Sequence, residues 1–113
     1  MATKATINQY LNGYPQKNGN HNKVVVLMNG PTDYDAGGVQ IDGEFAHVKN
    51  IHEIHVTSCS ALYDAYAVVN TNNPFFKASD ILLFVIDVSD GEQVADNTDL
   101  STIKFRFVIE GTN

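Results

Sequence analysis

Three histidines, His47, His52 and His55, are the residues whose type best suits metal binding. His52 and His55 fall in residues 51–58, where apolar residues recur as they do in a β-strand. Side chains three positions apart in a strand point to opposite faces, so this pair cannot chelate one ion together. Cys59 follows directly, but no nucleophile signature surrounds it and no orienting third group can be named. The pattern therefore predicts neither a metal site nor a catalytic thiol.

Carboxylates bracket a tight turn at Asp87, Asp90 and Glu92, and again over residues 96–99. Carboxylate oxygens are the ligands that calcium prefers, but the spacing is not that of an EF-hand loop. Asp and Asn also bind turn backbone directly, and this turn chemistry is the favoured interpretation. The chain contains no phosphate-binding loop and no Gly-x-Ser-x-Gly nucleophile motif. We therefore expect no cofactor, no bound metal, no catalytic residue and no enzymatic activity.

The charge balance argues against two classes of partner. Seven Lys+Arg stand against thirteen Asp+Glu, for a net charge of −6, and the basic residues are scattered along the chain. Nucleic-acid binding relies on a basic stripe that neutralises phosphates, and such a stripe is missing here. The longest apolar run, residues 81–86, is too short to cross a bilayer. We expect no nucleic-acid partner and no membrane partner. The single cysteine suits a chain made in a reducing cytoplasm.

The elements that position these residues are organised around the last third of the chain. Residues 80–88 are apolar on both strand parities, which predicts a central strand, and residues 100–111 alternate, which predicts a strand with one solvated face. Further strands are expected at 23–29, 51–58 and 62–70, with 59–61 as a hairpin link, residues 32–39 as a loop and 92–99 as a strand or loop. Strand parity predicts a core of Val24, Val26, Ile54, Val56, Leu83, Phe84, Ile86, Ile103, Phe105, Phe107 and Ile109.

Many short strands without a long amphipathic helix predict an all-β fold, a single-domain antiparallel β-sandwich or small barrel over residues 23–113. Residues 1–22 are rich in turn residues and predict a loop-rich N-terminal arm. Within the arm, Ile7, Tyr10, Leu11 and Tyr14 follow helical spacing, which allows one short helical turn. We expect these four side chains to anchor the arm on a partner.

Three stretches carry a resemblance: residues 23–26 (Lys-Val-Val-Val), 34–38 (Tyr-Asp-Ala-Gly-Gly), and 92–101 leading into 105–111. In these the chain resembles the small β-rich virion proteins of tailed bacteriophages, of the head-decoration or capsid-cement type. The resemblance implies a non-enzymatic protein on the capsid surface of the virion, which binds the outside of the major capsid protein shell and stabilises it. It further implies self-association, as a homotrimer or another homo-oligomer. A loop contact through Tyr34, Gly37 and Gly38 is expected beside the contact through the arm.

Two other interpretations remain open. One is a phage tail, neck or adaptor component. The other is a β-domain that binds a small ligand or a carbohydrate, with five tyrosines as possible stacking groups: Tyr10, Tyr14, Tyr34, Tyr63 and Tyr66. The absence of Trp weighs against a carbohydrate module.

Overall fold

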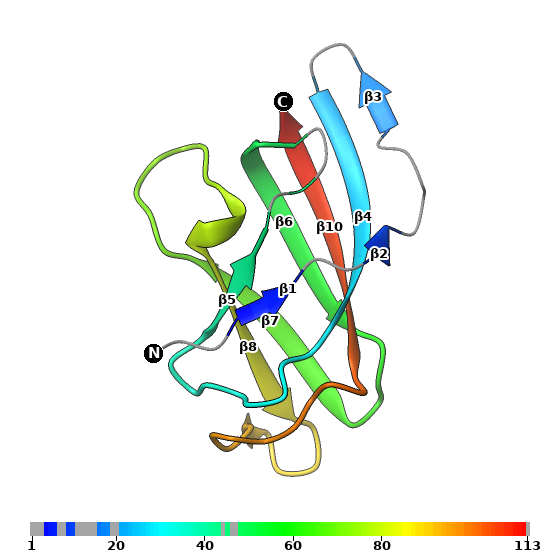
Figure 1. Cartoon of the computed structure of the whole chain (residues 1–113), viewed down its shortest axis with the longest axis vertical. Helices are drawn as coiled ribbons and strands as arrows, with labels where there is room; N and C mark the ends of the chain where they lie inside the picture. The colour runs from blue at the N-terminus through cyan, green and yellow to red at the C-terminus, as the bar shows by residue number, and fades with distance from the viewer. Residues whose placement is uncertain are drawn as a thin grey trace.

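The computed structural model describes residues 4–6, 9–10, 16–18, 21–43, 45 and 48–112, with side chains from residue 22 onward. This part of the chain forms two five-stranded sheets packed face to face (Figure 1). Among these residues, a short 3-10 helix, η1 (Ala78–Asp80), precedes one of the central strands. The predicted all-β sandwich is confirmed, and the described residues do not show a closed barrel.

The two sheets, which we call sheet A and sheet B, are built from strands that are interleaved along the chain. Sheet A contains β1 (Lys4–Thr6), β5 (Val39–Asp42), β8 (Ile81–Asp87) and β7 (Tyr63–Val69) in that order, with β9 (Glu92–Gln93) on β8. Sheet B contains β2 (Gln9–Tyr10), β4 (His21–Asn29), β10 (Lys104–Thr112) and β6 (Asn50–Ser58) in that order, with β3 (Gln16–Asn18) on β4. The β1–β5 pair is parallel and the other pairs are antiparallel.

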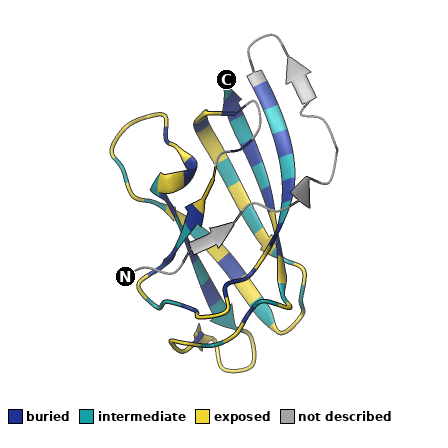
Figure 2. Ribbon diagram, viewed as in Figure 1, coloured by how far each residue is buried: buried dark blue, intermediate teal, exposed yellow. Residues whose placement is uncertain are grey.

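The core lies between the sheets and follows from strand alternation. Figure 2 shows the strands banded by burial, since successive side chains point to opposite faces. Of the predicted core, six residues are fully buried: Val24, Val26, Leu83, Phe105, Phe107 and Ile109. Ile54, Val56 and Ile103 are half-buried and pack against these residues. The parity predicted for the last strand is therefore confirmed.

The core prediction is wrong at Phe84 and Ile86. β8 is central, as expected, because β5 and β7 flank it. Its buried residues, however, are the odd-numbered ones: Ile81, Leu83 and Val85. Phe84 and Ile86 point to the outer face of sheet A, over which the described chain places no second layer. Apolar residues on both faces of a strand indicated burial on both faces, but only one face of β8 meets another sheet.

The predicted hairpin at residues 59–61 is also wrong. β6 pairs with β10 in sheet B, whereas β7 pairs with β8 in sheet A, so the link crosses from one sheet to the other. At its start the Cys59 N–H donates to the carbonyl of Lys104, and at its end the Leu62 carbonyl accepts from Val88. Short turn-like links can join strands of different sheets, and local sequence does not distinguish the two cases.

Strands also occur where loop was expected. β5 lies across the predicted loop and turn, and β9 occupies only the first two residues of 92–99. In the predicted arm, β1 pairs with β5, while β2 and β3 pair with β4, which itself begins at His21. The described parts of the arm are thus strands of the two sheets, not loop, and residues 9–10 are not helical. The domain boundary after residue 22 stays a prediction.

Candidate functional site

The outer face of sheet A carries a row of apolar pairs. In the antiparallel β7–β8 register, Tyr66 lies opposite Phe84, and Val68 lies opposite Leu82. Directly opposite residues share a face, and these pairs share the face that points away from the core. The rings of Tyr66 and Phe84 stack, with centroids 5.3 Å apart and planes 13° apart. The pair forms the centre of an exposed apolar surface.

This surface extends past the ends of both strands. The Val88 N–H donates to the Leu62 carbonyl at 3.1 Å, so the two segments stay paired one step further. Leu62 is 67% exposed, Val88 55%, Tyr66 46% and Val68 43%. Together with the half-buried members of β8, these residues form what we call the outer ladder: Leu62, Tyr66, Val68, Leu82, Phe84, Ile86 and Val88. Four of the five large apolar side chains that the described chain exposes belong to it.

Tyr34 lies in the core, so its prediction as a partner contact is wrong. It is 1% exposed. Its hydroxyl oxygen accepts hydrogen bonds from the Val85 N–H at 2.9 Å and from Gln93 Nε2 at 2.8 Å. The Tyr34 N–H also donates to the Thr98 carbonyl at 3.0 Å. The side chain therefore ties the 34–38 loop to β8 from the inside.

The two glycines of this loop differ in position. Gly37 is exposed, and its N–H donates to Asp35 Oδ1 at 2.8 Å. Gly38 has a positive φ of 109°, and a Cβ there would lie 3.0 Å from Phe84 Cζ and 3.1 Å from Leu82 Cβ. Only glycine readily combines this backbone with so close an approach. Gly38 thus packs beside the outer ladder, although its own role in partner binding stays a prediction.

The predicted anchors of the arm cannot be placed. Ile7, Leu11 and Tyr14 lie outside the described residues, and only the backbone of Tyr10 is described, in β2. Their role in partner binding stays a prediction. Tyr63 and Tyr66 differ in position. Tyr63 is half-buried against the core, and Tyr66 belongs to the outer ladder.

The titratable residues of β6, His52, Glu53 and His55, lie on exposed surface. His55 Nε2 is 3.2 Å from Glu53 Oε1 on β6, and His52 packs edge-on to the Phe75 ring. A hydrogen bond with Glu110 and a second with His55 lower the pKa of Glu53. Within the described chain, no group of three or more His, Cys, Asp or Glu is arranged to hold a metal ion, and His47 lies outside it. Cys59 is exposed and free.

The acidic turns serve their own backbone. Asp87 Oδ1 accepts from the Ser89 hydroxyl at 2.7 Å and from the Ser89 N–H at 2.9 Å, and these bonds lower the pKa of Asp87. Asp90 Oδ1 accepts from the Glu92 N–H at 2.9 Å. Turn chemistry, the favoured interpretation of these carboxylates, is confirmed at both positions.

The sequence analysis missed the outer ladder as a surface, although a signal was present. Residues 81–86 are apolar at every position, and Leu62, Tyr66 and Val68 share one parity on the strand before them. This pattern fits two arrangements: a strand buried on both faces, or a strand whose outer face is apolar and exposed. Which arrangement holds depends on whether another layer covers the outer face of sheet A, and the sequence does not show this.

Comparison of the chain with protein-family models, with curated proteins and with solved structures finds no match. No helix among the described residues is long and apolar enough to cross a membrane. The resemblance to phage head-decoration proteins stays a prediction, and the outer ladder is the feature from which a function has to be argued.

Proposed function

We propose that this chain is a non-enzymatic structural protein that attaches to a protein shell, with the outer ladder as its contact surface. The ladder itself is the observation that carries the proposal. Monomeric proteins rarely expose a contiguous apolar surface of several large side chains, and such surfaces mark interaction sites. Tyr66, Val68 and Val88 each leave 43–55% of their surface exposed, so much of their apolar area is not used in folding. A partner that covers them supplies the missing layer.

The resemblance of the sequence supports the identity of that shell. We propose a capsid decoration or cement protein of a tailed bacteriophage, located on the virion surface and bound to the major capsid protein. Self-association as a homotrimer or another homo-oligomer belongs to the same proposal. Weak contacts repeated over a symmetric shell combine into strong attachment, so each copy needs only a modest interface.

The composition of the outer ladder sets the expected strength of the contact. Aromatic residues at the centre of an interface dominate binding energy, and the stacked Tyr66–Phe84 pair occupies that position. Asp64 is the acidic member of the same face, opposite Ile86, and its Oδ1 accepts from the Ala65 N–H at 2.9 Å. The matching surface is therefore apolar at its centre, with a donor or a cation facing Asp64.

Co-sedimentation with phage heads that lack the protein tests this proposal. Tyr66→Ser should weaken binding by roughly tenfold or more, because it removes the central aromatic anchor. His55→Ser is the matched control, since it truncates an exposed ring on the outer face of sheet B. Both variants should melt close to the parent protein.

The possible results separate the two parts of the proposal. If Tyr66→Ser binds heads as the parent does, the outer ladder is not the contact. If the parent protein does not bind heads at all, the phage assignment is wrong. Analytical ultracentrifugation of the parent and of Tyr66→Ser then still tests whether the ladder mediates self-association.

A further inference from the structure

We propose that β7 pairs with β7 of a second copy of this chain, so that the two copies of sheet A join into one continuous sheet. The proposal rests on the self-association proposed above and deepens it, because it names the strand and the symmetry of the contact. β7 is the last strand of sheet A and has β8 on one side. On its other side, which we call the open edge, it has no strand neighbour in the described part of the chain. Such an edge is a template for pairing with another chain.

The hydrogen bonds at the two ends of β7 fix which of its residues face the open edge. The Val88 N–H donates to the Leu62 carbonyl at 3.1 Å. The Asn70 N–H donates to the Asp80 carbonyl at 2.7 Å. Because hydrogen-bonded positions alternate in an antiparallel pair, the even-numbered residues of β7 bond to β8. The backbone N–H and C=O groups of the odd-numbered residues therefore point to the open edge; these residues are Tyr63, Ala65, Ala67 and Val69.

The open edge offers backbone groups that the fold does not use. The N–H groups of Ala67 and Val69 have no acceptor among the residues that the structure describes. The Ala65 N–H donates to the neighbouring Asp64 Oδ1 at 2.9 Å, a local bond that a partner carbonyl can replace. β7 also lacks the features that usually block an edge, since it contains no Pro and no Lys and pairs with β8 without a bulge.

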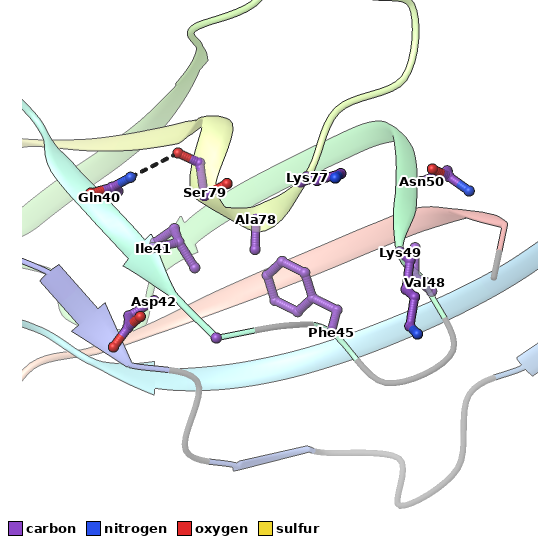
Figure 3. A pocket seen from close by; sticks show the side chains of 11 residues that line it. Gln40, Ile41, Asp42, Phe45, Val48, Lys49, Asn50, Lys77, Ala78 and Ser79 are labelled. Carbon is purple, nitrogen blue, oxygen red and sulfur yellow. Dashed lines mark hydrogen bonds between the residues drawn. The ribbon is translucent and has the colours of Figure 1, made fainter.

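Two other edges of the sandwich are shorter or interrupted. At the far end of sheet A the last strand is β1, with only three residues. Next to it, the Gln40 side chain of β5 donates to the Ser79 carbonyl at 3.0 Å and fastens η1 to that end (Figure 3). In sheet B the edge strand β6 has a register shift in its pairing with β10, and Ile51 exchanges two backbone hydrogen bonds of 2.8 Å with Phe76. β7, with seven residues, is by contrast long and regular.

The sequence of β7 favours a second copy of the chain as the occupant of the open edge. Its central residues, Ala65, Tyr66 and Ala67, read the same in both directions. Antiparallel pairing about a two-fold axis at Tyr66 places Ala65 of one copy opposite Ala67 of the other. These are open-edge residues, so the pair exchanges both backbone hydrogen bonds. A two-fold contact of this kind is the commonest form of self-association.

The flanking residues also match in this register. Tyr63 lies opposite Val69 of the other copy, and an aromatic residue opposite a β-branched one is a favourable cross-strand pair. Asp64 lies opposite Val68, so the acidic residues of the two copies do not face each other. On the outer face Tyr66 lies beside Tyr66 of the other copy, and each already stacks on its own Phe84. The two outer ladders thus become one larger apolar surface on a two-fold axis.

Disulfide trapping tests this register, in a Cys59→Ser background that removes the native exposed thiol. In the proposed dimer the two Tyr66 residues form a non-hydrogen-bonded pair with Cα atoms about 4.5 Å apart, which suits a disulfide. The two Val68 residues face Asp64 instead, which separates them by about 13 Å along the strands, and a disulfide cannot span this distance. Tyr66→Cys should therefore form a covalent dimer under mild oxidation at least roughly tenfold faster than Val68→Cys, the matched control on the same exposed face.

Sedimentation equilibrium over a concentration series tests the backbone contact. Ala67→Pro removes an open-edge N–H and leaves the bonds to β8 in place, since proline is tolerated on the free side of an edge strand. Each dimer then loses two hydrogen bonds, so dimerisation should weaken by about tenfold or more. Ala67→Ser changes the same side chain and keeps the N–H, so its dimerisation should stay within about twofold of the parent.

The outcomes decide the proposal without phage heads. Equal trapping of the two cysteine variants, trapping of neither, or a parent protein that stays monomeric throughout the series would each overturn it and leave the open edge to a strand of another protein. Should Ala67→Pro not fold, the two cysteine variants decide alone. A trapped Tyr66→Cys dimer supports edge pairing even if the parent does not bind heads, and head binding by a monomeric parent leaves the shell contact standing without it.

Discussion

The two outer faces of the sandwich are built by the same alternation and differ in composition. On sheet A the outward residues of β7 and β8 are Tyr66, Val68 and the apolar series of β8, with Asp64 as the charge among them. On sheet B the outward face is mixed: Lys104 and Arg106 of β10 are exposed and charged, whereas Val25, Leu27 and Val108 are apolar and half-buried. β6 adds Glu53, His55 and Thr57 to that face, all of them exposed.

The outer faces of sheets A and B differ in composition, and packing of the shared core does not explain this difference. Both sheets contribute fully buried aliphatic or aromatic residues to one core, so both meet the requirement for folding. Charged outward residues on sheet B are the ordinary solution for a solvated face. The apolar outer ladder costs solubility and contributes little to the core, so its composition points to a contact outside the chain.

The largest expected effect separates an inner aromatic residue from an outer one. Phe105→Ala should lower the free energy of unfolding by about 3–5 kcal/mol, because Phe105 is fully buried between the sheets. Phe84→Ala should lower it by less than half as much, since Phe84 is half-buried on the outer face. Urea denaturation of both variants measures the difference. Equal losses would mean that the outer ladder is as deeply packed as the core.

A second comparison uses Tyr34, which is hydrogen-bonded to β8 from the core, and Tyr66, which lies on the outer face of sheet A. Tyr34→Phe should cost about 1–3 kcal/mol in unfolding free energy, because it leaves the buried Val85 N–H without its acceptor. Tyr66→Phe removes a hydroxyl from an exposed ring and should change stability by less than about 0.5 kcal/mol. Thermal and urea melts of both single variants test this. A neutral Tyr34→Phe would indicate that water replaces the hydroxyl.

A third prediction concerns the outer faces alone. If the outer ladder also mediates the proposed self-association, Val68→Lys should reduce it, because it puts a charge into that apolar surface. Thr57→Lys on the outer face of sheet B should leave association unchanged. Both positions are exposed, so the free energy of unfolding should shift by no more than about 0.5 kcal/mol in either variant. Sedimentation velocity over a concentration series measures the association. Equal effects of the two lysines would remove the distinction between the faces.

The smallest effect is expected from pH. Hydrogen bonds from Ser89 lower the pKa of Asp87 in the folded protein below its ordinary value of 3.8. The ionised carboxylate therefore stabilises the fold above pH 3.8, and this stabilisation is lost as pH falls through the lower folded-state pKa. At pH 6, Asp87→Asn should melt slightly below the parent. The gap should narrow as the pH falls below 3.8 and should close once the pH lies below the folded-state pKa, where the parent carboxyl is protonated too. Melting curves from pH 6 to 2.5 test this, and a gap that widens on acidification would contradict it.

The sequence by itself determined the fold class and part of the core. Strand periodicity correctly predicted β4, β6, β7, β8 and β10, and it identified the buried parity of β4 and β10. These are local properties, because alternation in one strand reflects one buried and one solvated face. The same local signal correctly predicted turn chemistry at Asp87 and Asp90.

Only the tertiary structure decided which sheet each strand joins and how many layers cover it. Residues 59–62 link β6 to β7 across the two sheets because their partners, β10 and β8, lie far along the chain. Tyr34 belongs to the core because β8 and β9 supply its hydrogen-bond partners some fifty residues away. The sequence of β8 is apolar on both faces, as in a strand covered on both sides, but in the fold only one of these faces is buried. The outer ladder arises from such long-range choices, because strand pairing and the number of layers depend on contacts that local periodicity does not encode.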